Sequence, residues 1–275
     1  TAKAVDHKRP DIVVIINPFT KHVRIQVNPV FIAGRYRKFV RDIPQSKWFC
    51  SSCHGKGCQK CDGTGKMYPE SVEELISKPF LDATAGEKAA FHASGREDVD
   101  ARMLGTGRPF VIEILKPKKR FLDLKELEAT VNMYAKGKVE ISKLRFTNKE
   151  AVRSLKKAEL AQKEYYVLIE FENEVSEDDL RLIEEKLSGA LIKQQTPLRV
   201  LHRRADLTRE KYIYKVKVKK VSLNRALMKI RCQGGLYVKE LVSGDEGRTM
   251  PNISDLIGKR AKVLKLDVTN VIING

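Results

Sequence analysis

The first group of residues that could do chemistry is a charged stretch around Asp98. Residues 94–110 contain three acids and three arginines. Five small or turn-forming residues in this stretch exclude a continuous helix or strand, so we expect a loop. They are Ser94, Gly95, Gly105, Gly107 and Pro109. Residues 111–115 follow and alternate like a half-buried strand. Such a loop on a rigid element is a usual place for a functional site, and a solvated loop with surface ion pairs is the alternative.

Four cysteines form the second group, as the pairs Cys50-x-x-Cys53 and Cys58-x-x-Cys61. Two such pairs in a short glycine-rich span can direct four thiolates to one tetrahedral centre, so we expect a structural zinc. Four thiolates leave no open position for catalysis. Disulfides are the alternative, but they are typical of secreted domains, and the sequence shows no signal peptide. His54 could replace one thiolate, although we expect it to be a solvated loop residue.

The chain carries a large excess of positive charge. Lys and Arg number 53 against 35 acids, which gives a net charge of +18 and a pI near 9.7. Half of the excess lies between Arg203 and Arg231, where eleven Lys and Arg face two acids. This distribution indicates a polyanionic partner, most commonly nucleic acid. A basic, solvated face is the alternative.

The length of 275 residues allows a sizeable core, in one large domain or two smaller ones. No apolar run approaches the roughly 18 residues of a membrane span. We therefore expect a cytoplasmic protein with no membrane partner. The numbering begins at Thr1 without a methionine, and the first residues read as the middle of a protein. We expect a fragment of a longer chain.

Several elements could position these groups. Residues 12–16 and 22–27 predict a β-hairpin around a turn at 17–21. Ser71 followed by Glu74 predicts a capping box that opens a short helix. Residues 82–93 predict a helix or a connector that leads to the charged loop.

A strand-and-helix pattern follows from Val139 onward. Residues 138–146 predict a strand, 148–160 an amphipathic helix with apolar positions 152, 155 and 160, and 165–171 a strand buried on both faces. A helix is expected after the capping residue Ser176. Two long strands are expected near 211–221 and 226–232, the second with Cys232 in the core. In the first, strict alternation places Lys215, Lys217 and Lys219 on one face with Ile213, and the tyrosines and valines on the other. Strands of this kind with helices on one side predict an α+β domain.

The charged loop resembles a known family. Gly95-Arg96-Glu97-Asp98 is similar to the Gly-Arg-x-Asp motif of pseudouridine synthases, whose aspartate is catalytic. The longer run through Arg102, Leu104-Gly105 and Gly107-Arg108-Pro109-Phe110 resembles one branch, the archaeal and eukaryotic tRNA pseudouridine synthases of the T-arm. That branch modifies uridines 54 and 55. The resemblance implies that Asp98 is the catalytic residue and that Arg96 binds the substrate.

Further motifs of this family occur downstream in order. Lys163-Glu164-Tyr165 resembles the motif whose tyrosine stacks on the target base. The segment 235–241 resembles the motif whose basic residue, here Lys239, pairs with the aspartate. Leu266 matches an apolar residue near the base. Segments 195–204 and 244–252 also match the T-arm branch, and the first adds Arg203 and Arg204 as substrate-binding residues.

The resemblance also implies the architecture and partners. The fold is expected to be α+β, with a mixed, mainly antiparallel sheet and flanking helices. Residues 1–47 resemble the closing strands of a THUMP RNA-binding domain, on Gly34-Arg35-Tyr36-Arg37-Lys38, Ile43-Pro44-Gln45 and Trp48. Residues 48–66 would be the zinc knuckle and 67–275 the catalytic domain. The enzyme is expected to act on tRNA as a monomer, with a structural zinc and no catalytic cofactor.

The chemistry of uridine isomerisation suits these residue types. The N-glycosidic bond breaks, the base rotates, and a carbon–carbon bond forms, so an ionised carboxylate is needed but no redox group. Glu97 and Asp100 could compete with Asp98, and only the motif alignment selects Asp98. A non-enzymatic zinc-knuckle RNA-binding protein is the main alternative. A THUMP-containing methyltransferase is a weaker one, because Gly105-Thr106-Gly107 is followed by Arg-Pro, which suits no helix start of a nucleotide-binding loop.

Overall fold

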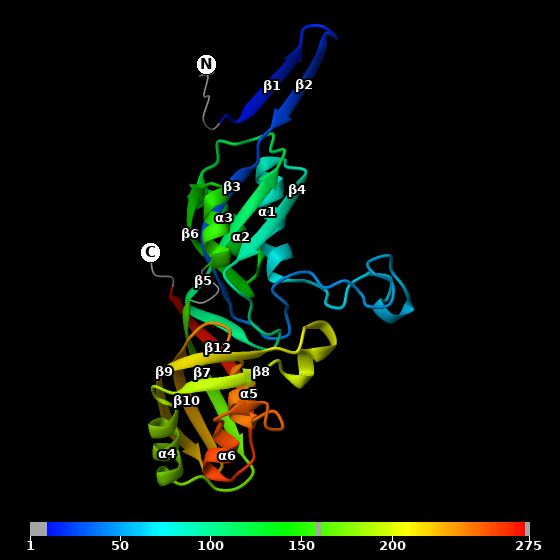
Figure 1. Ribbon diagram of the computed structural model, residues 1–275. Helices are drawn as coiled ribbons and strands as arrows, with labels where there is room; N and C mark the ends of the chain where they lie inside the picture. Colours follow the sequence, from blue (N-terminus) through cyan, green and yellow to red (C-terminus); the bar gives the residue numbers. More distant parts are fainter. Residues whose placement is uncertain (1–9, 158–160, 273–275) are drawn as a thin grey trace. The chain divides into compact units, whose positions relative to one another are not determined.

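The computed structural model describes residues 10–157 and 161–272 (Figure 1). These residues form two compact units. Unit 1 comprises the described residues of Thr1–Lys38, Ile43–Arg96 and Pro109–Lys156, and unit 2 comprises those of Phe39–Asp42, Glu97–Arg108 and Lys157–Gly275. These units are defined by the packing of the chain. The three functional segments expected from the sequence, residues 1–47, 48–66 and 67–275, remain predictions.

Unit 1 contains a hairpin and a four-stranded sheet. The hairpin of β1 (Ile12–Asn17) and β2 (His22–Val27) is antiparallel, as the sequence predicted. The sheet has the order β4-β5-β3-β6. Its strands are β3 (Val30–Lys38), β4 (Lys88–Ala93), the end of β5 (Arg102–Leu115) and β6 (Val139–Thr147). Both β3–β6 and β4–β5 pair antiparallel.

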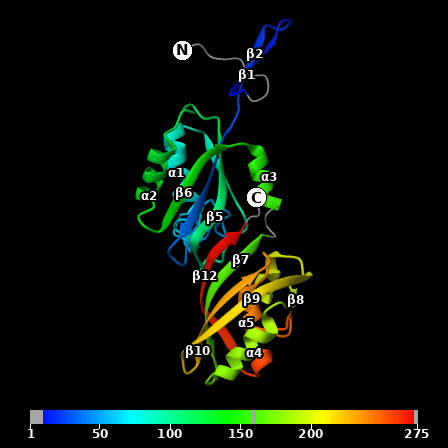
Figure 2. The ribbon, with the colours of Figure 1, turned by 90° about the vertical axis from the view of Figure 1, so that its left-hand side faces the viewer.

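Helices cover both faces of the sheet in unit 1. Helices α1 (Val72–Thr84) and α2 (Leu124–Tyr134) pack together on one side, and α3 (Lys149–Lys157) lies on the other (Figure 2). Ser71 caps α1 by accepting a hydrogen bond from the backbone N–H of Glu74, which confirms the predicted start. The predicted helix over 148–160 is confirmed to Lys157, and its apolar position 160 lies outside the described residues.

Two predictions for strands β4 and β5 were wrong. Residues 88–93 are strand β4, not a helix or connector, because they pair with β5. The expected loop also ends earlier than predicted, since β5 begins at Arg102 and runs through both glycines. Positive φ angles of 55° at Gly105 and 72° at Gly107 bend the strand where a side chain would be strained.

Unit 2 contains the other six strands of the same ten-stranded sheet, in the order β11-β8-β9-β10-β7-β12. The strands are β7 (Gln162–Phe171), β8 (Leu191–Gln195), β9 (Thr208–Ser222), β10 (Arg225–Cys232), β11 (Thr249–Met250) and β12 (Ala261–Ile272). All of these neighbours pair antiparallel, and β12 also pairs in parallel with the first residues of β5.

Three helices pack against this sheet and against one another (Figure 1). They are α4 (Glu177–Leu187), α5 (Val238–Ser243) and α6 (Ile253–Ile257). Helix α4, capped by Ser176 as predicted, also covers the edge of β9, where Ser188 and Glu184 accept the backbone N–H groups of Val216 and Val218. The predicted mixed, mainly antiparallel α+β fold is confirmed. No helix among the described residues has the length and apolar character to cross a membrane.

Two predictions about side-chain direction in unit 2 were also wrong. Strand β7 is not buried on both faces but alternates, with Tyr165 buried and Tyr166 exposed. In β9, a register shift opposite Arg231 and Cys232 inserts an extra residue at Tyr214. This irregularity breaks the strict alternation. Ile213 is therefore buried while both Tyr214 and Lys215 are exposed, so that tyrosines and lysines share the exposed side of the strand.

The close approach of β5 to β12 gives a stability prediction. A Cβ at Gly105 would lie 2.0 Å from the backbone oxygen of Thr269, at a φ of +55°. We expect Gly105→Ala to lower the free energy of unfolding by about 3 kcal/mol, measured by urea denaturation. Gly258→Ala is the control, because Gly258 has a φ of +64° but nothing within 4 Å of the added atom. Gly258→Ala should lower the free energy of unfolding by only about 1 kcal/mol. Equal losses would show that the contact with β12 is unimportant.

Candidate active site and metal centre

The backbone around Asp98 is fixed by a buried ion pair next to it in the sequence. Glu97 Oε2 lies 2.8 Å from Arg108 Nε, and the two side chains are 0% and 1% exposed. The carbonyl of Asp98 accepts a hydrogen bond from the N–H of Ala101, and that of Val99 accepts one from Asp42. Glu97 is thus held away from solvent, which leaves Asp98 and Asp100 as the accessible carboxylates of this loop.

A second set of contacts fastens the other end of the loop to β12. Arg102 donates two hydrogen bonds to Asp267, from Nε at 2.9 Å and from Nη2 at 2.6 Å. Arg41 Nη2 also donates to Asp267, at 2.6 Å, and Nη1 donates to the carbonyl of Asp100 at 2.7 Å. Burial alone would raise the pKa of Asp267, but the two arginines lower it. The loop is therefore held at both ends by arginine–carboxylate pairs.

The carboxylate of Asp98 lies between two cations. Arg199 Nη2 and Lys239 Nζ lie 3.2 Å and 3.3 Å from Asp98 Oδ2. The ammonium of Lys239 is closer to Asp100, at 2.8 Å from both of its oxygens. Burial alone would raise the pKa of Asp98, but Arg199 first and Lys239 second outweigh it, so the pKa is lowered. Asp98 is consequently an ionised carboxylate at neutral pH, with a side chain still one-third exposed.

Arg199 is the site residue that sequence reasoning missed. It lies in the 3-10 helix η3 (Leu198–Arg203), and its Nε donates to Glu240 Oε1 at 2.6 Å. Glu240 is 4% exposed, in helix α5 next to Lys239. The Arg199 guanidinium also lies 5.9 Å from the ring centre of Tyr237. The signal was present, since Arg199 is part of the matching segment 195–204, but the resemblance directed attention to Arg203 and Arg204 instead.

Tyr165 and Leu266 occupy neighbouring strands on the covered side of the sheet. Tyr165 of β7 is opposite Val268 of β12, and Leu266 is opposite Val167, so both side chains point to the same face. Each is 8% exposed. Burial raises the pKa of Tyr165, and the nearby charge of Asp98 raises it further. The structure thus brings Asp98 and Lys239 into contact, and Tyr165 belongs to the same unit.

The other expected substrate-binding arginines do not contact Asp98 in any of the hydrogen bonds or ion pairs described above. Arg203 is exposed at the end of η3, and the adjacent Arg204 donates to the hydroxyl of Tyr237 at 3.1 Å. Both belong to unit 2. Arg96 belongs to unit 1 and is exposed, with its guanidinium carbon 5.9 Å from the ring centre of Trp48.

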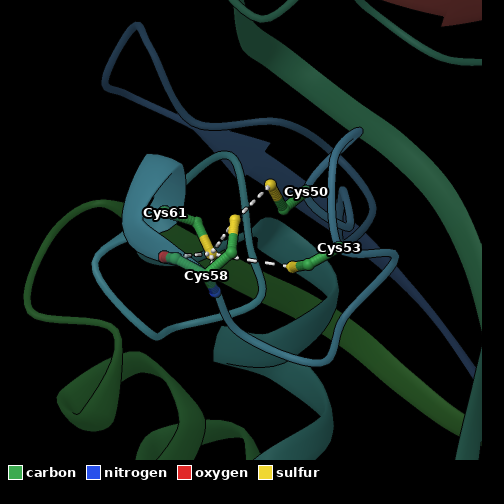
Figure 3. Close-up of side chains that lie close together, drawn as sticks. All are labelled: Cys50, Cys53, Cys58 and Cys61. Carbon is green, nitrogen blue, oxygen red and sulfur yellow. Dashed lines mark hydrogen bonds between the residues drawn. The ribbon is translucent and has the colours of Figure 1, made fainter.

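The four cysteines converge in unit 1 (Figure 3). Their sulfur atoms all lie within 4.8 Å of one another. The Sγ–Sγ distances are 3.9 Å for Cys50–Cys58, 3.8 Å for Cys53–Cys61 and 3.7 Å for Cys58–Cys61. A tetrahedral site with Zn–S bonds of about 2.3 Å requires sulfur separations of about 3.8 Å. The four free thiols therefore fit one tetrahedral metal ion.

The backbone supports thiolates at this centre. The N–H groups of Cys58 and Gly65 each donate to Cys61 Sγ at 3.2 Å, and that of Gly57 donates to Cys53 Sγ at 3.2 Å. Burial would raise the pKa of Cys61, but these backbone donors lower it to about 6. A Cβ at Gly65 would lie 2.5 Å from the backbone oxygen of Gly55, so this turn requires glycine. His54 is exposed, as expected of a solvated loop residue.

The comparisons with known proteins bear on this arrangement. The family model "Pus10, C-terminal" matches residues 31–272. The chain belongs to the Pus10 family. This membership confirms the family expected from the sequence motifs.

Curated Pus10 relatives align with almost the whole chain. The tRNA pseudouridine synthase Pus10 of Methanocaldococcus jannaschii is 50% identical over 270 residues, which are 98% of this chain and 59% of the relative. That of Methanothermobacter marburgensis is 50% identical over 268 residues, or 97% of this chain and 66% of the relative. The chain thus spans about three fifths to two thirds of the length of these relatives.

Among solved structures, a Cbf5-Nop10-Gar1 complex matches at 19% identity with a TM-score of 0.46, covering 73% of this chain and 45% of that one.

The two cations beside Asp98 give a prediction about its pKa. Because the charge of Arg199 stabilises the ionised carboxylate, Arg199→Gln should raise the pKa of Asp98, measured by carbon NMR of the carboxyl group during acid titration. Arg181→Gln is the control, because it removes one positive charge from the exposed surface of α4. It should leave the titration of Asp98 unchanged. An unchanged pKa of Asp98 in Arg199→Gln would mean that Lys239 alone stabilises the ionised carboxylate.

Proposed function

We propose that this chain carries the catalytic part of a tRNA pseudouridine synthase that isomerises uridine 54, uridine 55 or both in the T-arm. The observation that carries the proposal is the ionised, partly exposed Asp98 between Arg199 and Lys239. The names of the Pus10 relatives support the reaction, and the match of residues 244–252 to the T-arm branch supports the position.

Asp98 acts as the catalytic carboxylate. It serves either as a nucleophile or as the group that stabilises positive charge on the sugar while the N-glycosidic bond breaks. Both roles require the ionised form, which Arg199 and Lys239 favour. The two cations also keep Asp98 in place while the base rotates. No electron transfer is involved, so the protein groups alone can supply the charge that the reaction needs.

Tyr165 receives the target base. A uridine in a folded tRNA arm must leave its stack to reach a carboxylate in a pocket, and an aromatic face offsets part of the unstacking cost. The ring of Tyr165 is fixed between β10 and β12, opposite Ile230 and Val268. Leu266 supplies an apolar wall beside it.

Arginines contact the RNA around this pocket. Arg203 and Arg204 lie at and just beyond the end of η3, whose Arg199 reaches Asp98, so phosphates bound there would lie beside the pocket. Arg96, which precedes Asp98 by two residues in the chain, is a further RNA contact. The partner is tRNA, bound by the monomer.

The four cysteines hold a structural zinc. The sulfur separations and the free thiols support this ion, because four thiolates at such distances match its preferred geometry. The zinc would fix the span 50–61 that follows Trp48, whose ring contacts Arg96. It supplies stability, not chemistry.

Metal analysis tests the zinc. Inductively coupled plasma mass spectrometry of the purified protein should detect about one zinc per chain. Cys53→Ser should lose the metal, whereas Cys232→Ser should retain it, because Cys232 is buried in strand β10 and takes no part in the cluster. Protein without metal but with two disulfides would contradict the proposal.

Substitution of the carboxylate tests the reaction. Asp98→Asn keeps the size of the side chain but removes its charge, so pseudouridine formation on an unmodified tRNA transcript should fall to background while tRNA affinity persists. Tyr165→Phe keeps the stacking face and should retain more activity than Tyr165→Ala.

Asp100→Asn is the matched control. Asp100 lies two residues away, has a more exposed side chain and shares Lys239 with Asp98. Its substitution should leave the rate within about tenfold of the parent. Loss of activity in Asp100→Asn with retention in Asp98→Asn would overturn the assignment. If neither the parent nor any variant forms pseudouridine but the parent still binds tRNA, the alternative of a non-enzymatic RNA-binding protein is favoured.

A further inference from the structure

One face of the sheet in unit 2 carries exposed side chains along β7, β9 and β10. Along β10, Ala226, Met228, Ile230 and Cys232 are buried, and the intervening side chains are exposed. The exposed set on β10 is Arg225, Leu227, Lys229 and Arg231. Strand β7 alternates in the same way, so Tyr166 is 40% exposed although its neighbour Tyr165 is buried. Because successive residues of a strand point to opposite faces, the exposed face is the one turned away from Tyr165.

This exposed face combines aromatic rings with cations. Lys229 Nζ lies 5.7 Å from the ring centre of Tyr166, and the Arg231 guanidinium carbon lies 5.9 Å from that of Tyr214. Tyr212 packs edge-on against Tyr214, with the ring centres 5.1 Å apart. The irregularity in β9 creates this arrangement, since strict alternation would have separated Tyr214 from Lys217 and Lys219.

The positive charges on this face are only partly compensated, since Lys217 pairs with Glu184 at 2.6 Å. Tyr166, Lys229 and Lys217 are opposite one another on β7, β10 and β9, and Leu168, Leu227 and Lys219 form the next row. Two of the acids on this face are already engaged, because Glu170 pairs with Arg225 and Lys262, and Asp267 with Arg102. A third, Glu164, is opposite Arg231 on β7. Among the described residues, no carboxylate lies within ion-pairing distance of Lys215, Lys219 or Lys229.

We propose that this face is a second RNA-contact surface, distinct from the pocket at Asp98, which stacks unpaired bases on Tyr166 and Tyr214 and binds phosphates through Lys219, Lys229 and Arg231. Antiparallel sheets that display aromatic and basic side chains bind single-stranded RNA in this way. The excess of cations favours a polyanion over a neutral protein surface. Tyr166 and Tyr214 flank β10, so their strands are about 10 Å apart and each ring can take a separate base.

Binding of a fluorescein-labelled twelve-nucleotide single-stranded RNA tests the proposal by fluorescence anisotropy. The double variant Tyr166→Ala/Tyr214→Ala should bind at least about tenfold more weakly, because it removes both stacking contacts. The double variant Lys219→Gln/Lys229→Gln should reduce the slope of log affinity against log salt by about 1.4.

Matched substitutions in unit 1 are the controls. Tyr134→Ala removes a tyrosine that is 48% exposed at the end of α2, and Lys78→Gln/Lys125→Gln removes two helix-surface cations. These variants should bind the oligonucleotide as the parent does. Pseudouridine formation at saturating tRNA should be unchanged in the Tyr166/Tyr214 variant, since neither residue belongs to the pocket. Failure of the isomerase assay with the parent protein would therefore affect the proposed function and leave this proposal intact.

Three outcomes would overturn the proposal. The first is an oligonucleotide affinity within twofold of the parent in both double variants. The second is a reduced salt slope with no effect of the tyrosines, which would indicate a basic surface without stacking. The third uses the parent protein, so it does not depend on the folding of any variant. If 4-thiouridine oligonucleotides form no crosslink to the exposed residues of β7, β9 or β10, the surface is elsewhere.

Discussion

The buried ion pair between Glu97 and Arg108 is the interaction on which the proposed active site depends. It joins the residue before Asp98 to strand β5, with both side chains removed from solvent. Loss of one partner from such a pair leaves an uncompensated buried charge and costs roughly 3–5 kcal/mol. The pair therefore stabilises one conformation of the loop more than it stabilises the fold. Arg102 and Asp267 hold the other end, so Asp98 lies between two fixed points.

The two cations at Asp98 have different supports and so different roles. Lys239 is closer to Asp100 than to Asp98, and its charge is shared between them. Arg199 is fixed from behind by Glu240, whose buried carboxylate fixes the direction of the guanidinium. A cation held in this way keeps its geometry when the substrate arrives, whereas a lysine on a flexible stem can shift toward a phosphate. Arg199 is thus the better support for the ionised form of Asp98.

The sequence was sufficient for features that depend on local spacing. The pairs Cys50/Cys53 and Cys58/Cys61 and the cap at Ser71 involve residues close in the chain, so pattern alone located them. The contact between Arg199 and Asp98 joins residues 101 positions apart, and only the folded chain brings them together. The faces of β9 could not be assigned either, because counting by two assumes a regular strand and the register shift at Tyr214 breaks it. Strand β5 was mistaken for a loop since its glycines, which suggest turns, here permit close contact with β12.

Adjacent residues of one strand can serve separate surfaces because a sheet isolates its two faces. Tyr165 and Tyr166 are neighbours in β7, yet one is buried on the side of Asp98 and the other is exposed beside Lys229. Changes on the exposed face need not disturb the packing that fixes Tyr165, since that packing comes from Ile230 and Val268 on the covered side. The same strands can therefore support a buried tyrosine on one face and a basic surface on the other. A register error of one residue in β7 would exchange the two tyrosines. The dense pairing of β7 with both β10 and β12 prevents that exchange, and so maintains the division between the two surfaces.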